Sequence, residues 1–135
     1  KEYRRQRQMC IRDRSNGDFT ITASPGKHMV PTIGLRIKDE AGGRMLAYSG
    51  DTSPCSNILR MAAGADVLIH EATAASLGHS SAAQAGKVAA EAQVGKLYLI
   101  HYDVLGAEES DLLSEARSQF GGPVELARDL MTIEL

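Results

Sequence analysis

Three polar clusters between residues 48 and 81 constrain the fold more than any other feature of the chain. Two follow apolar runs, at Tyr48–Thr52 and Ile69–Thr73, and the third, at Gly78–Ser81, opens an alanine-rich segment. Open α/β sheets carry functional side chains at the carboxyl ends of their strands, because the strand fixes the backbone while the following loop presents the side chains. Asp51, Glu71 and His79 are therefore the first candidates for a functional site.

The composition is typical of an ordered protein without a membrane segment. The chain has 135 residues, of which 43% are hydrophobic, and a formal net charge of −2. This is enough for about one domain with a buried core, and no apolar run approaches the ~18 residues of a membrane span. Cys10 and Cys55 are far apart and form no CxxC motif, so they indicate neither a disulfide framework nor a thiolate zinc site. We expect a cytoplasmic protein with no membrane partner.

The first fourteen residues differ in charge from the rest of the chain. Residues 1–14 hold six Lys or Arg against two acidic residues, whereas residues 15–135 hold nine against fifteen. Such a shift usually marks a tail, and a short basic tail is more often a solvated extension than a nucleic-acid arm. Residues 9–14 also look like adapter read-through, so we interpret residues 1–14 as a leader, possibly foreign, and assign it no function. Residues 15–135 are then a partial domain.

The chain from residue 18 to residue 48 predicts antiparallel strands. Residues 18–23 and 32–38 alternate apolar and polar side chains, which is typical of half-buried strands. A Gly-Gly turn within 39–43 separates the second strand from a third at 44–48, so these two form a hairpin. This hairpin places Asp51 just beyond its far end.

After Asp51 the pattern changes to alternating helices and strands. Helices are expected from a Thr52 or Ser53 cap to Gly64, from a Ser80 or Ser81 cap over 82–92, and over 107–120, with strands at 66–70, 97–101 and 130–135. The continuous apolar strands are typical of buried parallel pairing. The chain therefore predicts an α/β fold with a mixed sheet and helices on one face.

All four histidines lie at the ends of predicted elements. His28 is in a loop, His70 and His101 end strands, and His79 precedes a helix. Each alone is more often a structural residue than a ligand. Together with Asp51, however, they would meet at one edge of the sheet, where imidazole and carboxylate groups suit zinc or another borderline divalent ion.

These residues carry a resemblance to a known family. The motifs are Ser49-Gly50-Asp51-Thr52, then Gly64 to Thr73 with its His70-Glu71-Ala72-Thr73 end, then His79-Ser80-Ser81, then Leu97 to His101. In this order they resemble the metallo-β-lactamase fold hydrolases, specifically the ribonuclease Z-like branch. The resemblance covers residues 18–135 and implies the C-terminal half of an αββα sandwich.

The resemblance implies a role for each site residue. His28, Asp51 and His101 correspond to metal ligands, with Asp51 bridging two zinc ions. His79 corresponds to a catalytic proton donor or oxyanion stabiliser beside the scissile phosphate, and Glu71 to a residue that orients a neighbour. His70 is expected to be structural. Two ions about 3.5–4 Å apart can share a hydroxide and balance charge on a phosphoryl group.

Two departures from the family qualify this interpretation. No two histidines are separated by one residue, so the family's His-x-His-x-Asp-His motif, which supplies four metal ligands, is absent from these 135 residues. We therefore expect the chain alone to be inactive. After His101 the tRNA-processing members resemble His-Phe-Ser-x-Arg-Tyr, whereas this chain continues Tyr102-Asp103-Val104-Leu105 without the arginine.

Three functions remain open. The first is a zinc-dependent phosphodiesterase of the ribonuclease Z-like type, acting on RNA or a small phosphodiester. The second keeps the fold and metals but cleaves a sulfate ester, lactone or other small ester. The third is a non-catalytic interaction module. An isolated half would expose a sheet face, so we expect self-association, for example as a homodimer.

Overall fold

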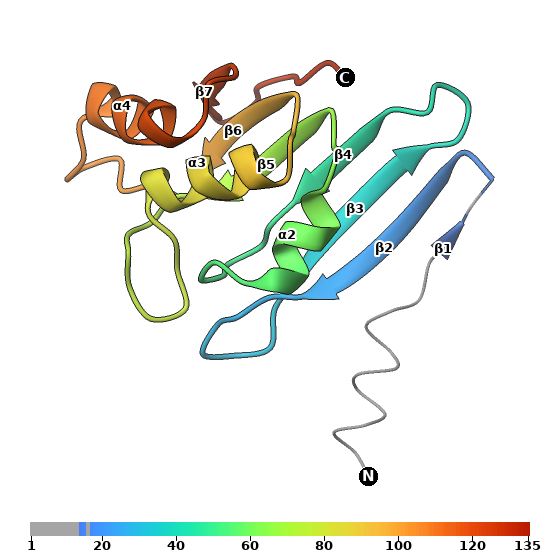
Figure 1. The fold of residues 1–135 in the computed structure, drawn as a ribbon, viewed down its shortest axis with the longest axis horizontal. Helices are drawn as coiled ribbons and strands as arrows, with labels where there is room; N and C mark the ends of the chain where they lie inside the picture. The colour runs from blue at the N-terminus through green and yellow to red at the C-terminus, as the bar shows by residue number, and fades with distance from the viewer. Residues whose placement is uncertain (1–13, 16) are drawn as a thin grey trace, which may run out of the picture.

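The computed structural model describes residues 14, 15 and 17–135, so all of the predicted leader except Arg14 lies outside the described residues. The described residues form a seven-stranded mixed sheet whose spatial order, β1 to β7, follows the chain (Figure 1). The helices α2, α3 and α4 cover one face of this sheet (Figure 1). The predicted α/β fold, with a mixed sheet and helices on one face, is confirmed. None of the described helices has the length and apolarity to cross a membrane.

The first four strands are antiparallel. They are β1 (Arg14–Ser15), β2 (Phe19–Pro25), β3 (Ile33–Asp39) and β4 (Met45–Tyr48). The β3–β4 turn forms as predicted, because the Asp39 carboxylate accepts the N–H groups of Ala41 and Gly42 at 3.0 and 2.9 Å. Asx turns of this kind are a frequent way to reverse a chain.

The remaining strands are parallel to β4. They are β5 (Val67–Glu71), β6 (Lys96–Ile100) and β7 (Val124–Leu126), joined by α2 (Ser56–Ala62), α3 (Ala82–Glu91) and α4 (Glu109–Gln119). Each parallel pair needs a crossover connection, and the helices provide it. The carboxyl ends of β4, β5 and β6 therefore lie at one edge of the sheet.

The last strand is not where the sequence pattern placed it. The prediction of a strand at 130–135 is wrong, because the edge strand is Val124–Leu126. Val124 and Leu126 are buried against α4 and β6, whereas Leu130 and Leu135 are 104% and 46% exposed. The Gly121-Gly122-Pro123 segment returns the chain to the sheet directly after α4, and the Pro123 carbonyl accepts the Leu97 N–H at 3.0 Å.

The start of α2 also differs from the prediction. Cys55 is its N-cap and makes no side-chain cap hydrogen bond, so the expected caps Thr52 and Ser53 were wrong. Both hydroxyls bind elsewhere: Thr52 Oγ1 accepts the Lys27 N–H at 2.9 Å, and Ser53 Oγ accepts the Gly78 N–H at 2.9 Å. By contrast, Ser81 caps α3 as predicted, in a capping box with Gln84.

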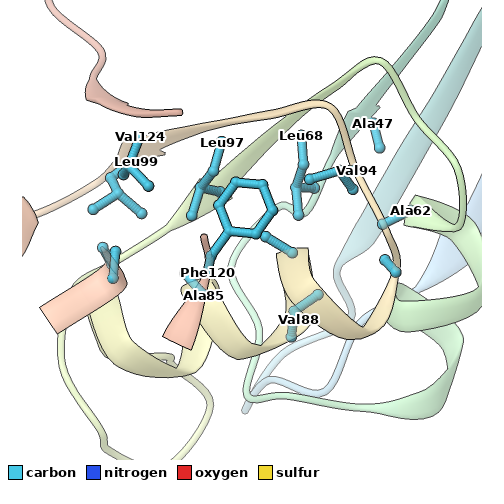
Figure 2. Close-up of a cluster of buried hydrophobic side chains, with 14 of the residues drawn as sticks. Ala47, Ala62, Leu68, Ala85, Val88, Val94, Leu97, Leu99, Phe120 and Val124 are labelled. Atoms are coloured by element: carbon cyan, nitrogen blue, oxygen red, sulfur yellow. The ribbon is translucent and has the colours of Figure 1, made fainter. Parts of the chain in front are cut away.

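The hydrophobic core lies between the helices and the sheet (Figure 2). Leu68, Leu97 and Leu99 point from β5 and β6 into it and are fully buried. Figure 2 shows the Phe120 ring among these leucines and the side chains of α3. The helices themselves contribute mainly alanines, and Gly86 of α3 lies against the Ala116 backbone of α4 so closely that an added Cβ would clash with it. Small residues thus let the helices pack tightly on the strands.

Alternate residues of the strands point to the opposite face of the sheet. That face carries cross-strand apolar pairs, namely Ile21 with Ile37, Ile37 with Leu46, Leu35 with Tyr48, Tyr48 with Ile69, and Ile69 with Tyr98. The three described helices all lie on the other side (Figure 1). The sheet therefore has one face covered by α2, α3 and α4, and a second face that is apolar over its central strands.

Candidate metal centre

The predicted site residues are gathered at the edge of the sheet where β4, β5 and β6 end. Asp51 follows β4, Glu71 is the last residue of β5, and His101 follows β6. His79 lies in the loop before α3, and His28 in the loop between β2 and β3. The parallel arrangement predicted from the sequence brings Asp51, Glu71 and His101 together, since parallel strands end at a common edge.

A glycine sets the position of Asp51. Gly50 has a φ of +61°, and its Cα lies against the Ile33 carbonyl, so an added side chain would meet that oxygen. Only glycine adopts this conformation without a steric cost. Thr32 Oγ1 then donates to the Asp51 carbonyl at 2.9 Å, which fixes the backbone on which the carboxylate stands.

Asp51, His79 and His101 form a compact cluster. Each offers one ligand atom, and these three atoms all lie within 4.8 Å of one another. His101 Nδ1 is 3.0 Å from Asp51 Oδ1, and the ring centroids of His79 and His101 are 5.6 Å apart. The side chains of His101 and Asp51 are 50% and 40% exposed, so the cluster opens to solvent.

Glu71 is a buried carboxylate that binds His79 of the cluster. Its side chain is buried, and its Oε1 accepts the Thr52 N–H at 2.7 Å and the His79 Nδ1–H at 3.0 Å. Its Oε2 accepts the Thr73 N–H at 3.3 Å. A buried carboxylate held by backbone donors is a fixed acceptor, and it orients the imidazole bound to it.

His28 lies beside the cluster. Its Nδ1–H donates to the Gly78 carbonyl at 2.8 Å, and its ring meets that of His79 edge to face, with centroids 4.7 Å apart. It does not belong to the group whose ligand atoms lie within 4.8 Å of one another. The structure thus brings Asp51 and His101 together with His79 more closely than with His28.

The three site histidines share one feature. In each ring Nδ1 is engaged by an oxygen: the Gly78 carbonyl for His28, Glu71 for His79, and both Asp51 and Thr73 Oγ1 for His101. For His28 and His79 the partner of Nδ1 lies outside the cluster, so Nε2 is the nitrogen left to face an ion, whereas His101 Nδ1 faces Asp51 within the cluster. Metal-binding histidines commonly donate their second ring N–H to a carboxylate or carbonyl in this way.

Thr73 and the backbone of His101 form a part of the site that sequence reasoning missed. Thr73 Oγ1 donates to the His101 carbonyl at 2.7 Å and lies 3.2 Å from its Nδ1. His101 has a φ of +51°, a conformation that is uncommon for a residue with a side chain and that recurs at functional sites. No residue type at position 101 or 102 signals this conformation in the sequence.

His70 is the exception among the histidines. It is completely buried on the helix-covered face, its Nδ1–H donates to the Glu71 carbonyl at 2.8 Å, and its Nε2 has no hydrogen-bond partner among the described residues. Burial lowers the pKa of His70, because the charged form loses its hydration. It takes no part in the cluster.

The donor set suits a divalent transition metal. Two imidazoles and one carboxylate are the ligands that zinc and neighbouring ions bind. Tetrahedral zinc would place its ligand atoms roughly 3.3 Å apart, given bonds of about 2.0 Å, so the spread of up to 4.8 Å seen here is wider than that of a closed site.

Comparison with known proteins agrees with this geometry. Residues 5–102 match the family described as "Beta-lactamase superfamily domain". Ribonuclease Z of Thermoplasma acidophilum is 42% identical over 112 residues, which cover 74% of this chain and 36% of that protein. The chain therefore spans about a third of the length of this curated relative.

Solved structures show the same fold. The metallo-β-lactamase fold protein YhfI from Bacillus subtilis matches with a TM-score of 0.79 and 32% identity, over 87% of this chain and 50% of that one. The short form of human tRNase Z matches with a TM-score of 0.67 and 24% identity, over 90% and 45% of the two chains, and supports the fold alone. The chain belongs to the β-lactamase superfamily and has the metallo-β-lactamase fold.

Proposed function

We propose that this chain carries part of the catalytic centre of a zinc-dependent phosphodiesterase of the ribonuclease Z type. The observation that carries the proposal is the cluster of Asp51, His79 and His101, whose ligand atoms lie within 4.8 Å of one another. The likeness to ribonuclease Z of Thermoplasma acidophilum favours RNA or another phosphodiester as the substrate.

In the complete protein we assign His28, Asp51 and His101 as residues that would hold two zinc ions, with the Asp51 carboxylate shared between them. The ligands still required would come from a segment outside these 135 residues, and that segment would also cover the apolar sheet face. The chain alone is then inactive. Bound divalent ions would lower the pKa of a coordinated water and offset negative charge on the reacting ester.

We assign His79 as the proton donor to the leaving oxygen. Its Nδ1–H is held by Glu71 Oε1 at 3.0 Å, so the ring is fixed and its other nitrogen is directed away from that carboxylate. A histidine can carry a proton near neutral pH and release it to an alkoxide. Glu71 acts through His79 and is a positioning residue, tied in turn to the Thr52 and Thr73 backbone.

One observation favours the second candidate, hydrolysis of a small sulfate ester, lactone or other ester. The loop that follows His101 exposes Val104 and Leu105, which are 74% and 96% exposed, where the tRNA-processing members carry an arginine. Exposed apolar side chains in this loop suit a small ester, such as a lactone, better than a polyanion, which binds through Lys and Arg.

The test uses the complete protein that contains this sequence. The zinc-loaded protein is assayed with bis(p-nitrophenyl) phosphate, a precursor tRNA, a lactone and a sulfate ester. We expect phosphodiester cleavage, abolished with metal binding in Asp51→Ala. In His79→Ala we expect kcat to fall about 10²–10⁴-fold, as for loss of a general acid, while the metal content is kept.

Asp129→Ala is the matched control, because Asp129 is an exposed carboxylate near the end of the chain. It should keep both metal and rate. Cleavage of the lactone or sulfate ester alone would move the assignment to the second candidate, and a metal-free, inactive complete protein would refute both.

A further inference from the structure

We propose that the 135-residue chain binds a single divalent ion by itself, through Asp51, His79 and His101, so that His79 is a metal ligand in this chain. The inference rests on the proposed metal centre but changes its ligand set. In the complete protein His79 is assigned as the proton donor. In the 135-residue chain it would instead take the place of the metal ligands that lie outside these residues.

Proximity is the first argument. The only group of three or more candidate ligands found among the described residues joins His79, not His28, to Asp51 and His101. To reach the roughly 3.3 Å between ligand atoms of a tetrahedral ion, Asp51 and His101, which are half-exposed and already 3.0 Å from each other, would rotate together toward His79.

The second argument is the environment of His79. Its Nδ1–H is bound to the buried Glu71 carboxylate at 3.0 Å, and Glu71 is itself held by the backbone N–H groups of Thr52 and Thr73. A carboxylate that holds one imidazole nitrogen fixes the ring and raises the basicity of the other nitrogen, as in carboxylate–histidine–zinc sites. The cluster has only one imidazole that is supported by a buried carboxylate, and it is His79.

The third argument is the number of ligands. Three protein ligands with an open fourth position are a complete mononuclear zinc site. Two imidazoles and one carboxylate carry one negative charge, which offsets half the charge of the ion. The chain can therefore close a mononuclear site without any residue from elsewhere, whereas a dinuclear site needs more ligands than these loops carry.

The experiment is a titration of the purified, metal-free chain with Co²⁺, followed by visible absorption and by calorimetry. We expect one Co²⁺ per chain with the absorption of a four- or five-coordinate site. His79→Ala, Asp51→Ala and His101→Ala should each weaken binding at least ~100-fold. Glu71→Gln should weaken it about 10–100-fold, as for other groups that support a ligand.

His28→Ala is the comparison that decides between the two ligand sets. It should weaken binding less than ~10-fold, because His28 lies outside the cluster. Circular dichroism reports the folding of each variant, and His79→Asn takes the place of His79→Ala where the alanine variant does not fold. Asp129→Ala should bind as the unchanged chain does.

Several results would overturn the inference. If Co²⁺ affinity is kept in His79→Ala but lost in His28→Ala, Asp51→Ala and His101→Ala, then His79 is not a metal ligand. Its role as proton donor, and the proposed function, would stand. Two ions per chain, or one ion per two chains, would refute a self-contained mononuclear site. Binding that is indifferent to Asp51→Ala and His101→Ala would refute the metal centre itself, and the proposed function with it.

Discussion

The helix-covered core and the site edge are built from different kinds of contact. In the core, Leu68, Leu97 and Leu99 are fully buried among apolar neighbours and contribute no polar side-chain atoms. At the edge, Asp51 and Glu71 are held by hydrogen bonds from loops that lie far apart in the sequence. We therefore expect the core to provide most of the stability of the ion-free fold, and the edge to provide the ligands for an ion. A substitution in the core should change the unfolding free energy without changing ion affinity, and a substitution at the edge should change ion affinity without unfolding the chain.

Leu97→Ala should give the largest effect on stability. Leu97 is fully buried beneath the helices, and a leucine-to-alanine change in such a core costs about 2–5 kcal/mol of unfolding free energy. Urea denaturation measures it, with Leu77→Ala as the control, because Leu77 is 76% exposed near the site. Folded Leu97→Ala should bind Co²⁺ as the unchanged chain does, and a parallel loss of affinity would break the separation between core and edge.

Gly86→Ala should have the next largest effect. A methyl group at position 86 would clash with the Ala116 backbone and push α3 away from α4, at a cost of about 1–3 kcal/mol. Gly121→Ala is the matched control, since a methyl group there meets no atom within 4 Å. Thermal unfolding of the two variants compares them. Equal melting temperatures would mean that the helix contact is looser than the structure indicates.

His70 is a buried histidine whose titration should make the stability of the fold depend on pH. Burial lowers its pKa, so the unfolded chain binds more protons than the folded one at acidic pH. Stability from neutral His70 is thus complete above the ordinary histidine pKa of ~6.5 and is lost as the pH falls below it, with a slope of up to about 1.4 kcal/mol per pH unit.

Urea denaturation at pH 7.5, 6.5 and 5.5 measures this slope. In His70→Leu, which cannot titrate, the loss of stability toward pH 5.5 should be smaller than in the unchanged chain. The same slope in both proteins would show that other groups, those of the site edge included, govern the acid sensitivity of the fold.

Ser81→Ala should have the smallest effect. Ser81 Oγ accepts the Gln84 N–H at 3.2 Å, and the Gln84 side chain accepts the Ser81 N–H at 2.9 Å. Loss of such a cap costs about 1 kcal/mol. Ser114→Ala, on the exposed side of α4, is the control and should be neutral or slightly stabilising. Because α3 follows His79 directly, an unchanged Co²⁺ affinity in Ser81→Ala would show that the edge tolerates fraying of the helix.

The sequence predicted the parts of the fold in which local pattern and tertiary structure agree. Residues 18–23 and 32–38 alternate apolar and polar side chains, and the observed strands β2 and β3 follow that alternation. The edge strand was missed because Val124–Leu126 is too short to show a period, while residues 130–135 are apolar enough to imitate a strand. The α2 cap was missed because Thr52 and Ser53 bind backbone groups from distant loops, which no local rule reveals.

The candidate site was predictable to a similar degree. Residue types at strand ends pointed to Asp51, Glu71, His79 and His101, and the structure places all four at one edge. The contact between Glu71 and His79 was anticipated only as a supporting role for Glu71. The Thr73 contacts and the positive φ of His101 depend on how two loops meet, and the sequence holds no periodic signal for such contacts.

The order of the strands also has a consequence for how the chain folds. The antiparallel strands β2, β3 and β4 are joined by short loops, but β4, β5 and β6 pair only after α2 and α3 have crossed the sheet. Pairing of strands that are distant in the sequence is slow, so we expect the parallel pairs to form late in folding. Asp51, His79 and His101 lie more than 20 residues apart along the chain, so the unfolded chain offers no comparable site.

An ion held by this cluster is therefore bound by the native state alone, and at 100 times its dissociation constant it adds about 2.7 kcal/mol to the unfolding free energy. A shortage of the ion would then lower the fraction of the chain that is folded.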